Sequence, residues 1–434
     1  MNQGDVSVTL SEWQTLTPEN TPHLRDVSLG DGIDYQSTLN LLHKSKKLSI
    51  RELRTGVEIA ARSHVGRIQL GNLEVTIQPK IESGCMLRLL RYAYGFRGLH
   101  LYSRAEQLTS KIGFADLLIS QLLQEAQELI SRGLRMSYVR QDERLASPRG
   151  RIDIGRLALE AGSATATLPC QHFPRLEDTL INQVLLGGLR LAANVASLLE
   201  LRRDACRLAS QMDEQVSPIK LESAVMSRLS DHQSRLTDAY DPAIAIIRLL
   251  MESQGITLDG KTMPTQLPGF LFDMNSFFQA FVSRFLNDYL PSYSVHDEYG
   301  LKGMMRYDSQ HNPRRRQSPT PRPDFVVKHR DSVVAILDAK YRDLWERSLP
   351  RDILYQLVIY AMSHPDLRSS TIIYPTTSTR AKPARVNVKD PVRGQHLGKV
   401  WLRPLNLGEL DQLLSSAKKN CRRECEEIAC RLVG

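Results

Sequence analysis

Three charged side chains interrupt two apolar runs between residues 322 and 343. Asp324 begins the run DFVV, Asp338 follows the run VVAIL, and Lys340 comes two residues after Asp338. An unpaired charge inside a buried strand is costly, so these side chains either face solvent or converge on a ligand that requires them. Because successive strand residues alternate between two faces, Asp338 and Lys340 are expected on the same face.

The tetrapeptide HRDS between the two runs predicts a hairpin that brings Asp324 and Asp338 to the same end of a sheet. Two carboxylates and a nearby carbonyl, such as that of Ala339, make a hard oxygen site that suits Mg²⁺ and also admits Mn²⁺. Such an ion lowers the pKa of a bound water and stabilises charge during attack on a phosphate, while Lys340 orients or deprotonates the water. In the structural alternative, Asp324 caps its strand, Asp338 pairs with Lys340 and nothing reacts.

The stretch RDILYQLVIYAMSH predicts a helix that carries Gln356 and Tyr360. Residues four apart share one helical face, so both side chains can reach one phosphate or metal-bound water. The alternative is a packed tyrosine beside a solvated glutamine.

The elements around these residues alternate between helix and strand. We expect first a helix, MNSFFQAFVSRFLNDYL, then a strand and the polar insert DSQHNPRRRQSPTPRP. Two strands follow, DFVVKH and VVAILDAKY, then the helix RDILYQLVIYAMSH and the strand STIIYP. This alternation predicts a compact α/β domain with a mixed central sheet.

The preceding part of the chain is expected to be an α+β region with a β-rich start and a helical middle. Short strands are indicated by VSVTL, KLSI, VGRIQLG and NLEVTIQPK, and a long helix by FADLLISQLLQEAQELISRGLRMSYV. A change to a Gly-, Pro- and Thr-rich composition at 253–270 predicts a domain boundary. We therefore expect segments at 1–80, 81–260 and 261–434, the last ending in a helical tail.

Composition and charge limit the class of protein. The chain has 434 residues and a net charge of +9, which fits a polyanionic partner or an incidental surplus. Residues 311–330 hold six Lys or Arg and one Asp, either to neutralise phosphates or as a solvated loop. Cys421, Cys425 and Cys430 have helical spacing, so reduced thiols on one helix are expected rather than zinc, which indicates a cytoplasmic protein.

Two sequence signals are missing. No signal peptide and no membrane span are expected, because every apolar run is short or interrupted by charge. The stretch GITLDGKT at 255–262 has the spacing G-x-x-x-x-G-K-[ST], but no helical pattern follows it as a phosphate loop requires, so any NTPase is expected to be supplied by another chain.

Pro323-Asp324 followed by Asp338-Ala339-Lys340 resembles the PD-(D/E)xK nuclease signature, and the spacing of Gln356 and Tyr360 resembles the Q-x-x-x-Y motif of its RecB-like branch. Other stretches resemble the nuclease subunit, McrC, of McrBC-type 5-methylcytosine restriction systems. These are EVTIQPKI, MLRLLRYAYGF, SPRGRIDI, LPCQHFPRLEDTLINQVLLGGL and FDMNSFFQAFVSRFL.

The resemblance implies a Mg²⁺-dependent DNA endonuclease subunit that acts with a McrB-like AAA+ GTPase or ATPase ring and docks to it through the β-rich N-terminal region. Its implied metal ligands are Asp324, Asp338 and Ala339, and its implied catalytic residues are Asp324, Asp338, Lys340, Gln356 and Tyr360. Gln279 stands where this nuclease group often has a glutamate, and an amide is a poor metal ligand. Two alternatives therefore remain: a stand-alone RecB-like repair nuclease, and a non-catalytic DNA-binding adaptor that stimulates a partner NTPase.

Overall fold

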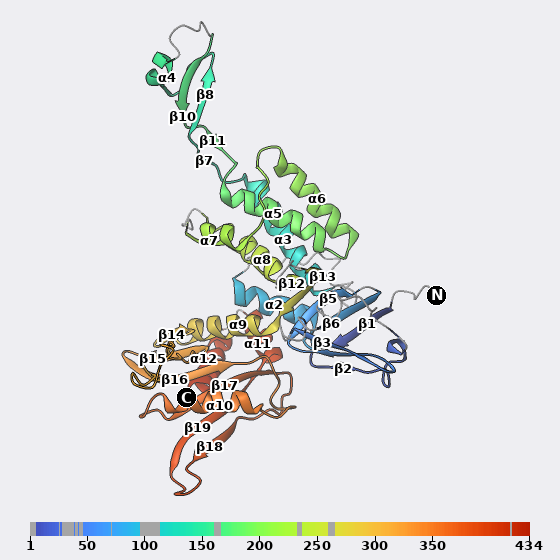
Figure 1. Cartoon of the computed structure of the whole chain (residues 1–434), viewed down its shortest axis with the longest axis vertical. Coiled ribbons are helices and arrows are strands. Elements are labelled where there is room, and N and C mark those ends of the chain that lie inside the picture. Colours follow the sequence, from blue (N-terminus) through green and yellow to red (C-terminus); the bar gives the residue numbers. More distant parts are fainter. Residues whose placement is uncertain are drawn as a thin grey trace. The chain divides into compact units, whose positions relative to one another are not determined.

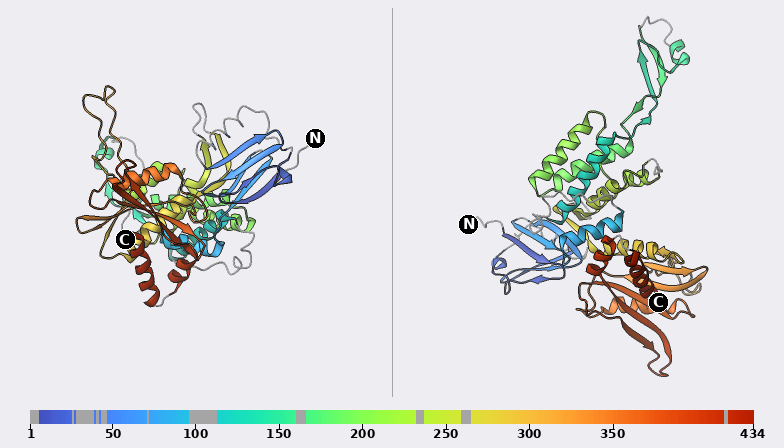
Figure 2. Two further views of the ribbon diagram at one scale, coloured as in Figure 1. Left: turned by 90° about the horizontal axis from the view of Figure 1, so that it is seen from below. Right: turned by 180° about the vertical axis from the view of Figure 1, so that it is seen from behind.

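The computed structural model describes residues 6–25, 27, 39, 42, 47–70, 72–95, 113–159, 166–231, 237–258, 265–416 and 419–434. The chain forms two compact units (Figures 1 and 2). Met1–Phe96 and Gly255–Gly434 make the first, here called the terminal unit, and Arg97–Gln254 make the second, the central unit. The expected division into segments at 1–80, 81–260 and 261–434 stays a prediction. In the structure, the N-terminal and C-terminal parts of the chain belong to one compact unit.

The N-terminal part of the terminal unit consists of two sheets that share one hydrophobic core. Its strands are β1 (Val6–Ser11), β2 (Thr15–Leu16), β3 (Leu48–Leu53), β4 (Gly56–Ala61), β5 (His64–Leu70), β6 (Leu73–Gln78), β12 (Gln254–Leu258) and β13 (Thr265–Asp273). One sheet has the order β1-β6-β5-β13-β12 and the other β2-β4-β3. Residues along β5 and β6 alternate between the core and the surface. The β-rich start that was expected for the chain is confirmed.

The region 253–270, where a domain boundary was predicted, contains strands β12 and β13, and the division between the two compact units falls between Gln254 and Gly255. β13 pairs antiparallel with β5, with Gly269 opposite Ile68 and Leu271 opposite Gly66. A Cβ on Gly269 would lie 2.6 Å from the carbonyl oxygen of Arg67, so glycine is required there for close approach. The composition of this region indicated the boundary but not the pairing of β13 with β5.

The C-terminal part of the terminal unit is a six-stranded mixed sheet with helices on both faces. Its elements are α9 (Met274–Tyr289), β14 (Ser294–Asp297), β15 (Phe325–His329), β16 (Ser332–Ala339), α10 (Arg351–Met362), β17 (Ser369–Thr376), β18 (Ala384–Lys389), β19 (His396–Asn406), α11 (Leu407–Ser415) and α12 (Lys419–Val433). The strand order is β14-β15-β16-β17-β19-β18, with β16, β17 and β19 parallel. A mixed sheet was expected, and it is confirmed.

Helix α10 contacts β16, β17 and β19 and closes a core that includes Ile336, Leu357 and Ile372. Helices α9 and α12 contact β16, and α12 lies on the side of the sheet away from α10 (Figure 2). The C-terminal helix α12 carries Cys421, Cys425 and Cys430 as free thiols, which confirms their expected place on one helix. The hairpin formed by β18 and β19 was not expected from the sequence.

The central unit is mainly helical, as expected. Its helices are α3 (Phe114–Arg132), α4 (Ile154–Leu159), α5 (Leu180–Val195), α6 (Leu199–Asp213), α7 (Ser223–Asp231) and α8 (Asp241–Ser253), and its strands are β7 (Ser137–Tyr138), β8 (Gln141–Leu145), β9 (Arg151–Ile152), β10 (Leu168–His172) and β11 (Arg175–Leu176). Strands β8, β10 and β9 form a small sheet reached through the ribbon β7–β11 (Figure 1).

The helix expected from Phe114 to Val139 is shorter than predicted. It ends at Arg132, because Gly133 adopts a φ of 89° and donates its N–H to the carbonyl of Ile130. Across the described ranges, no helix has both the length and the apolar character needed to cross a bilayer.

Candidate active site

The hairpin of β15 and β16 places the two predicted carboxylates opposite each other. Phe325 pairs with Leu337 in antiparallel register, so the next pair outward is Asp324 and Asp338. The turn between the strands contains Arg330 with a φ of 55°. The predicted hairpin and its alignment of the two aspartates are therefore found in the structure.

Asp324, Asp338 and Lys340 converge at the end of β16. The Lys340 Nζ lies 3.1 Å from Asp338 Oδ2 and 3.5 Å from Asp324 Oδ2. The backbone N–H of Ala339 donates to Asp324 Oδ2 at 2.8 Å, which fixes the carboxylate against the neighbouring strand. The predicted use of the Ala339 carbonyl as a metal ligand stays a prediction.

Asp338 is the most buried of the three, with only 1% of its side chain exposed. Its Oδ2 lies 3.1 Å from the Lys340 ammonium, and neither oxygen accepts a hydrogen bond from any other described residue. Burial, and then the negative charge of Asp324, raise the pKa of Asp338 to about 7. A buried carboxylate without directed hydrogen bonds is costly, and a cation would offset that cost.

The ammonium group of Lys340 is subject to opposing effects. Burial lowers its pKa, but the charges of Asp338 and Asp324 together raise it more, so the net shift is upward. Lys340 therefore remains positively charged at neutral pH. Its ammonium group can donate hydrogen bonds to an anion or to a water molecule bound between the carboxylates.

Helix α10 brings Gln356 and Tyr360 to the same region. The Gln356 Nε2 donates to the Tyr360 hydroxyl at 2.6 Å, and that hydroxyl donates to the carbonyl oxygen of Arg322 at 2.8 Å. Burial raises the pKa of Tyr360, and the charges of Asp338 and Asp324 add to this rise. In this arrangement Tyr360 holds the backbone two residues before Asp324; the predicted contact with phosphate stays a prediction.

The donor set is compatible with Mg²⁺ only if water or substrate completes the coordination. Within the described ranges, no cluster of three or more His, Cys, Asp or Glu side chains could hold a metal ion. Mg²⁺ commonly binds through one or two carboxylates and keeps several waters or phosphate oxygens. Asp324 and Asp338 meet that requirement. A bound cation would also stabilise the buried carboxylate of Asp338.

Two other predicted features lie near this part of the sheet. Gln279 is a half-buried residue of α9, so an amide stands on the first helix of the domain. The basic insert is exposed and contains neither helix nor strand between residues 303 and 321, and Asn312 organises it by hydrogen bonds with Arg316. Its Arg residues are open to a polyanion or to solvent.

The sequence interpretation missed Tyr341, which directly follows Lys340. Its hydroxyl donates to Glu12 Oε1 at 3.2 Å, and its backbone N–H donates to Asn275 Oδ1 at 3.3 Å. The tyrosine was included in the expected strand VVAILDAKY, but no local pattern indicates a partner 329 residues away.

A family profile described as "McrBC 5-methylcytosine restriction system component" matches residues 59–375. This range covers most of the chain, from β4 to β17. The chain belongs to this family, and the expected resemblance to McrBC-type restriction systems is confirmed.

Two solved structures are similar to this chain. One is described as the refined half-complex from a tetradecameric assembly of Thermococcus gammatolerans McrB AAA+ hexamers with bound McrC; the match has a TM-score of 0.62 and 19% identity and covers 98% of this chain and 100% of the other. The second is a cryo-EM structure of the Thermococcus gammatolerans McrBC complex, with a TM-score of 0.46, 20% identity and coverage of 65% and 88%. The first likeness shows a shared fold. The comparison with curated proteins finds no match.

Proposed function

We propose that this chain is the McrC-like nuclease subunit of a modification-dependent restriction complex and hydrolyses DNA phosphodiesters with Mg²⁺. The observation that carries the proposal is the convergence of Asp324, Asp338 and Lys340 at one strand end, with the oxygens of Asp338 lacking directed hydrogen bonds. The order Pro-Asp, then Asp-x-Lys on the next strand of a mixed sheet supports assignment to the PD-(D/E)xK nucleases.

Each residue of the proposed site has a defined task. Asp324 and Asp338 would hold the divalent ion, which when bound supplies Lewis-acid stabilisation of the phosphate and a more acidic water. Lys340 directs its ammonium group between the carboxylates, where it can orient the attacking water and offset negative charge on the phosphate. Tyr360 and Gln356 hold the backbone before Asp324 and so fix one carboxylate.

The proposed complex includes a second protein that hydrolyses NTP. The stretch GITLDGKT at 255–262 has the spacing of a phosphate loop, but it begins in strand β12 and the next described element is strand β13, not the helix that such a loop needs. The chain that shares the fold comes from an assembly of McrB AAA+ hexamers with bound McrC. We propose a McrB-like AAA+ GTPase or ATPase as partner and modified DNA as substrate. The β-rich residues 1–80 are the proposed docking region.

The test compares site variants with matched variants on the same hairpin. Asp338→Asn and Lys340→Met are assayed on methylated DNA with Mg²⁺, the AAA+ partner and NTP, beside Asp331→Asn and Lys328→Met. The first two should slow cleavage by at least about 100-fold, as expected when charge stabilisation at the reacting phosphate is lost, with partner binding retained. The latter two should cut like the wild type, because Asp331 is exposed in the turn and Lys328 lies against Tyr299. Wild-type cleavage by either site variant would overturn the proposal.

Gln279 favours a second function, that of a DNA-binding adaptor which stimulates the partner without cutting. With a glutamine at this position, helix α9, which contacts β16, offers an amide where a metal ligand would need a carboxylate. Calorimetry separates the two functions, because the adaptor should bind neither Mg²⁺ nor Mn²⁺, whereas the nuclease should bind one ion that Asp338→Asn abolishes.

A further inference from the structure

We propose that the N-terminal sheets supply positioning residues for the candidate active site, with Glu12 as the principal one. This inference rests on the proposed nuclease function and extends it, because residues 1–80 were expected only to dock a partner. The connection runs through Tyr341, the residue that follows Lys340, and through the loop from 341 to 347.

The first connection is a buried hydrogen bond between Tyr341 and Glu12. The tyrosine hydroxyl donates to Glu12 Oε1 at 3.2 Å, and the backbone N–H of Lys80 donates to the same oxygen at 3.1 Å. Glu12 is 1% exposed and Tyr341 5% exposed. Removing one partner of such a pair leaves a buried polar group unsatisfied, so Glu12 holds the Tyr341 ring in one place.

The second connection fixes the backbone of Tyr341. Its N–H donates to Asn275 Oδ1 at 3.3 Å, and Asn275 Nδ2 donates to Ser63 Oγ at 2.6 Å. The backbone carbonyl of Ser63 accepts from Met274 N at 2.9 Å. Both the side chain and the backbone of Tyr341 are therefore held, directly or through one residue, by the N-terminal region.

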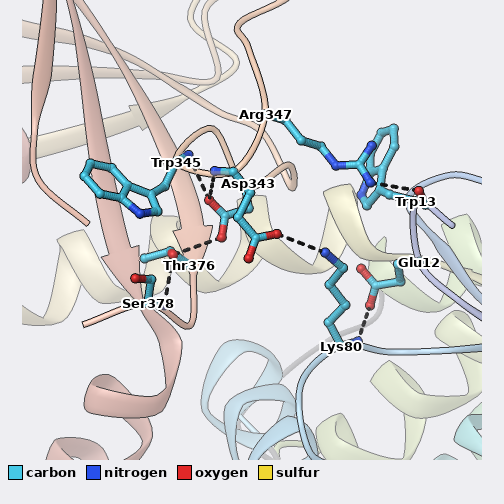
Figure 3. A network of polar contacts seen from close by, with 9 residues as sticks. Glu12, Trp13, Lys80, Asp343, Trp345, Arg347, Thr376 and Ser378 are labelled. Atoms are coloured by element: carbon cyan, nitrogen blue, oxygen red, sulfur yellow. Dashed lines mark hydrogen bonds and ion pairs between the residues drawn. The ribbon is translucent and has the colours of Figure 1, made fainter. Parts of the chain in front are cut away.

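The loop after Tyr341 is held from the same side (Figure 3). Arg347 Nη2 donates to the carbonyl oxygen of Trp13 at 2.8 Å, and Lys80 Nζ pairs with Glu346 Oε2 at 3.4 Å. The guanidinium groups of Arg342 and Arg347 lie 5.4 and 5.9 Å from the centre of the Trp13 ring. Trp13 has a φ of 61°, which is uncommon for a bulky residue and places its carbonyl and ring at this loop.

These contacts act on Lys340 through the strand end. Lys340 and Tyr341 are consecutive, and the backbone N–H of Lys340 donates to the carbonyl of Ile373 at 3.0 Å, so β17 holds one residue and the N-terminal region holds the next. The Lys340 ammonium has to lie between two carboxylates. A displacement of about 1 Å in such a group can lower a rate by about 100-fold.

The experiment uses the full chain with its AAA+ partner and four variants. Tyr341→Phe removes the hydroxyl, Glu12→Leu removes the acceptor, and Glu12→Gln keeps an oxygen that can accept both bonds. Tyr92→Phe is the matched control, because Tyr92 donates to Asp288 Oδ2 at 2.7 Å within the same unit but away from Lys340. Single-turnover cleavage at saturating Mg²⁺, DNA affinity and melting temperature are measured for each.

Tyr341→Phe and Glu12→Leu should slow cleavage by about 10- to 100-fold with DNA affinity unchanged. Glu12→Gln should restore a rate close to that of the wild type, and Tyr92→Phe should cut normally even if its melting temperature falls. If the wild type is active and Tyr341→Phe cuts as fast as Tyr92→Phe, the positioning role is refuted while the proposed nuclease function stands. A wild-type complex that does not cut refutes the nuclease function, and the positioning role with it.

Discussion

The Lys340 Nζ lies 3.1 Å from Asp338 Oδ2, although neither oxygen of Asp338 accepts a directed hydrogen bond from the described residues. The attraction between the two charges holds the pair at the end of β16. A cation that enters the site would compete with Lys340 for Asp338 Oδ2. The buried charge of Asp338 thus destabilises the fold, and the same carboxylate is a proposed ligand of the metal ion.

Asp338 should make the metal-free protein less stable as the pH rises. Its folded pKa of about 7 lies above the ordinary value, so the folded state binds more protons between about pH 4 and pH 7 and the free energy of unfolding falls across that window. Asp338→Asn should remove this dependence and raise stability at pH 8 by a few kcal/mol at most, since one pKa unit corresponds to about 1.4 kcal/mol. Urea unfolding at pH 4.5 and pH 8 measures it, with Asp331→Asn as control. Equal pH dependence in wild type and Asp338→Asn would contradict the assignment.

Binding of Mg²⁺ should release protons near neutral pH. Asp338 carries a proton in part of the molecules at pH 6.5, and a carboxylate must be deprotonated before it binds a metal ion. Calorimetry in two buffers of different ionisation enthalpy should detect up to about one proton released per ion at pH 6.5 and almost none at pH 8.5. The same release at both pH values would show that Asp338 is not a ligand.

Tyr360→Phe should destabilise the terminal unit and slow cleavage. It removes the hydrogen bond from the buried Tyr360 hydroxyl to the carbonyl of the exposed Arg322, at a cost of about 0.5–1.5 kcal/mol. Tyr355→Phe is the control on the same helix, because Tyr355 is exposed. Urea unfolding and cleavage are compared for the two variants. An unchanged cleavage rate in Tyr360→Phe would mean that holding this backbone does not matter to the reaction.

The part of the site that could be predicted is the part built from local sequence. Asp324 and Asp338 are joined by a short hairpin, so alternation and turn composition suffice to place them together. Gln356 and Tyr360 follow helical spacing in the same way, and their mutual hydrogen bond is a direct result. What the sequence did not indicate was that the Tyr360 hydroxyl already has a backbone acceptor at Arg322.

The parts that could not be predicted depend on contacts distant in sequence. Glu12 and Tyr341 have no pattern in common, and a single glutamate in a β-rich segment is more often exposed than buried. The composition of 253–270 indicated a domain boundary but not the pairing of β13 with β5, for which Gly269 is required. Propensity and period describe each element by itself, whereas these features depend on which elements meet.

The pairing of β13 with β5 also has a consequence for synthesis of the chain. Strand β5 pairs with β6 on one side and with β13 on the other, yet residues 97–254 are translated between them. Until residue 273 has left the ribosome, one edge of β5 lacks its native neighbour and presents free backbone N–H and C=O groups. The N-terminal sheet is therefore finished only after the whole central unit has emerged, and the nascent chain has to keep that edge from pairing with another molecule during the interval.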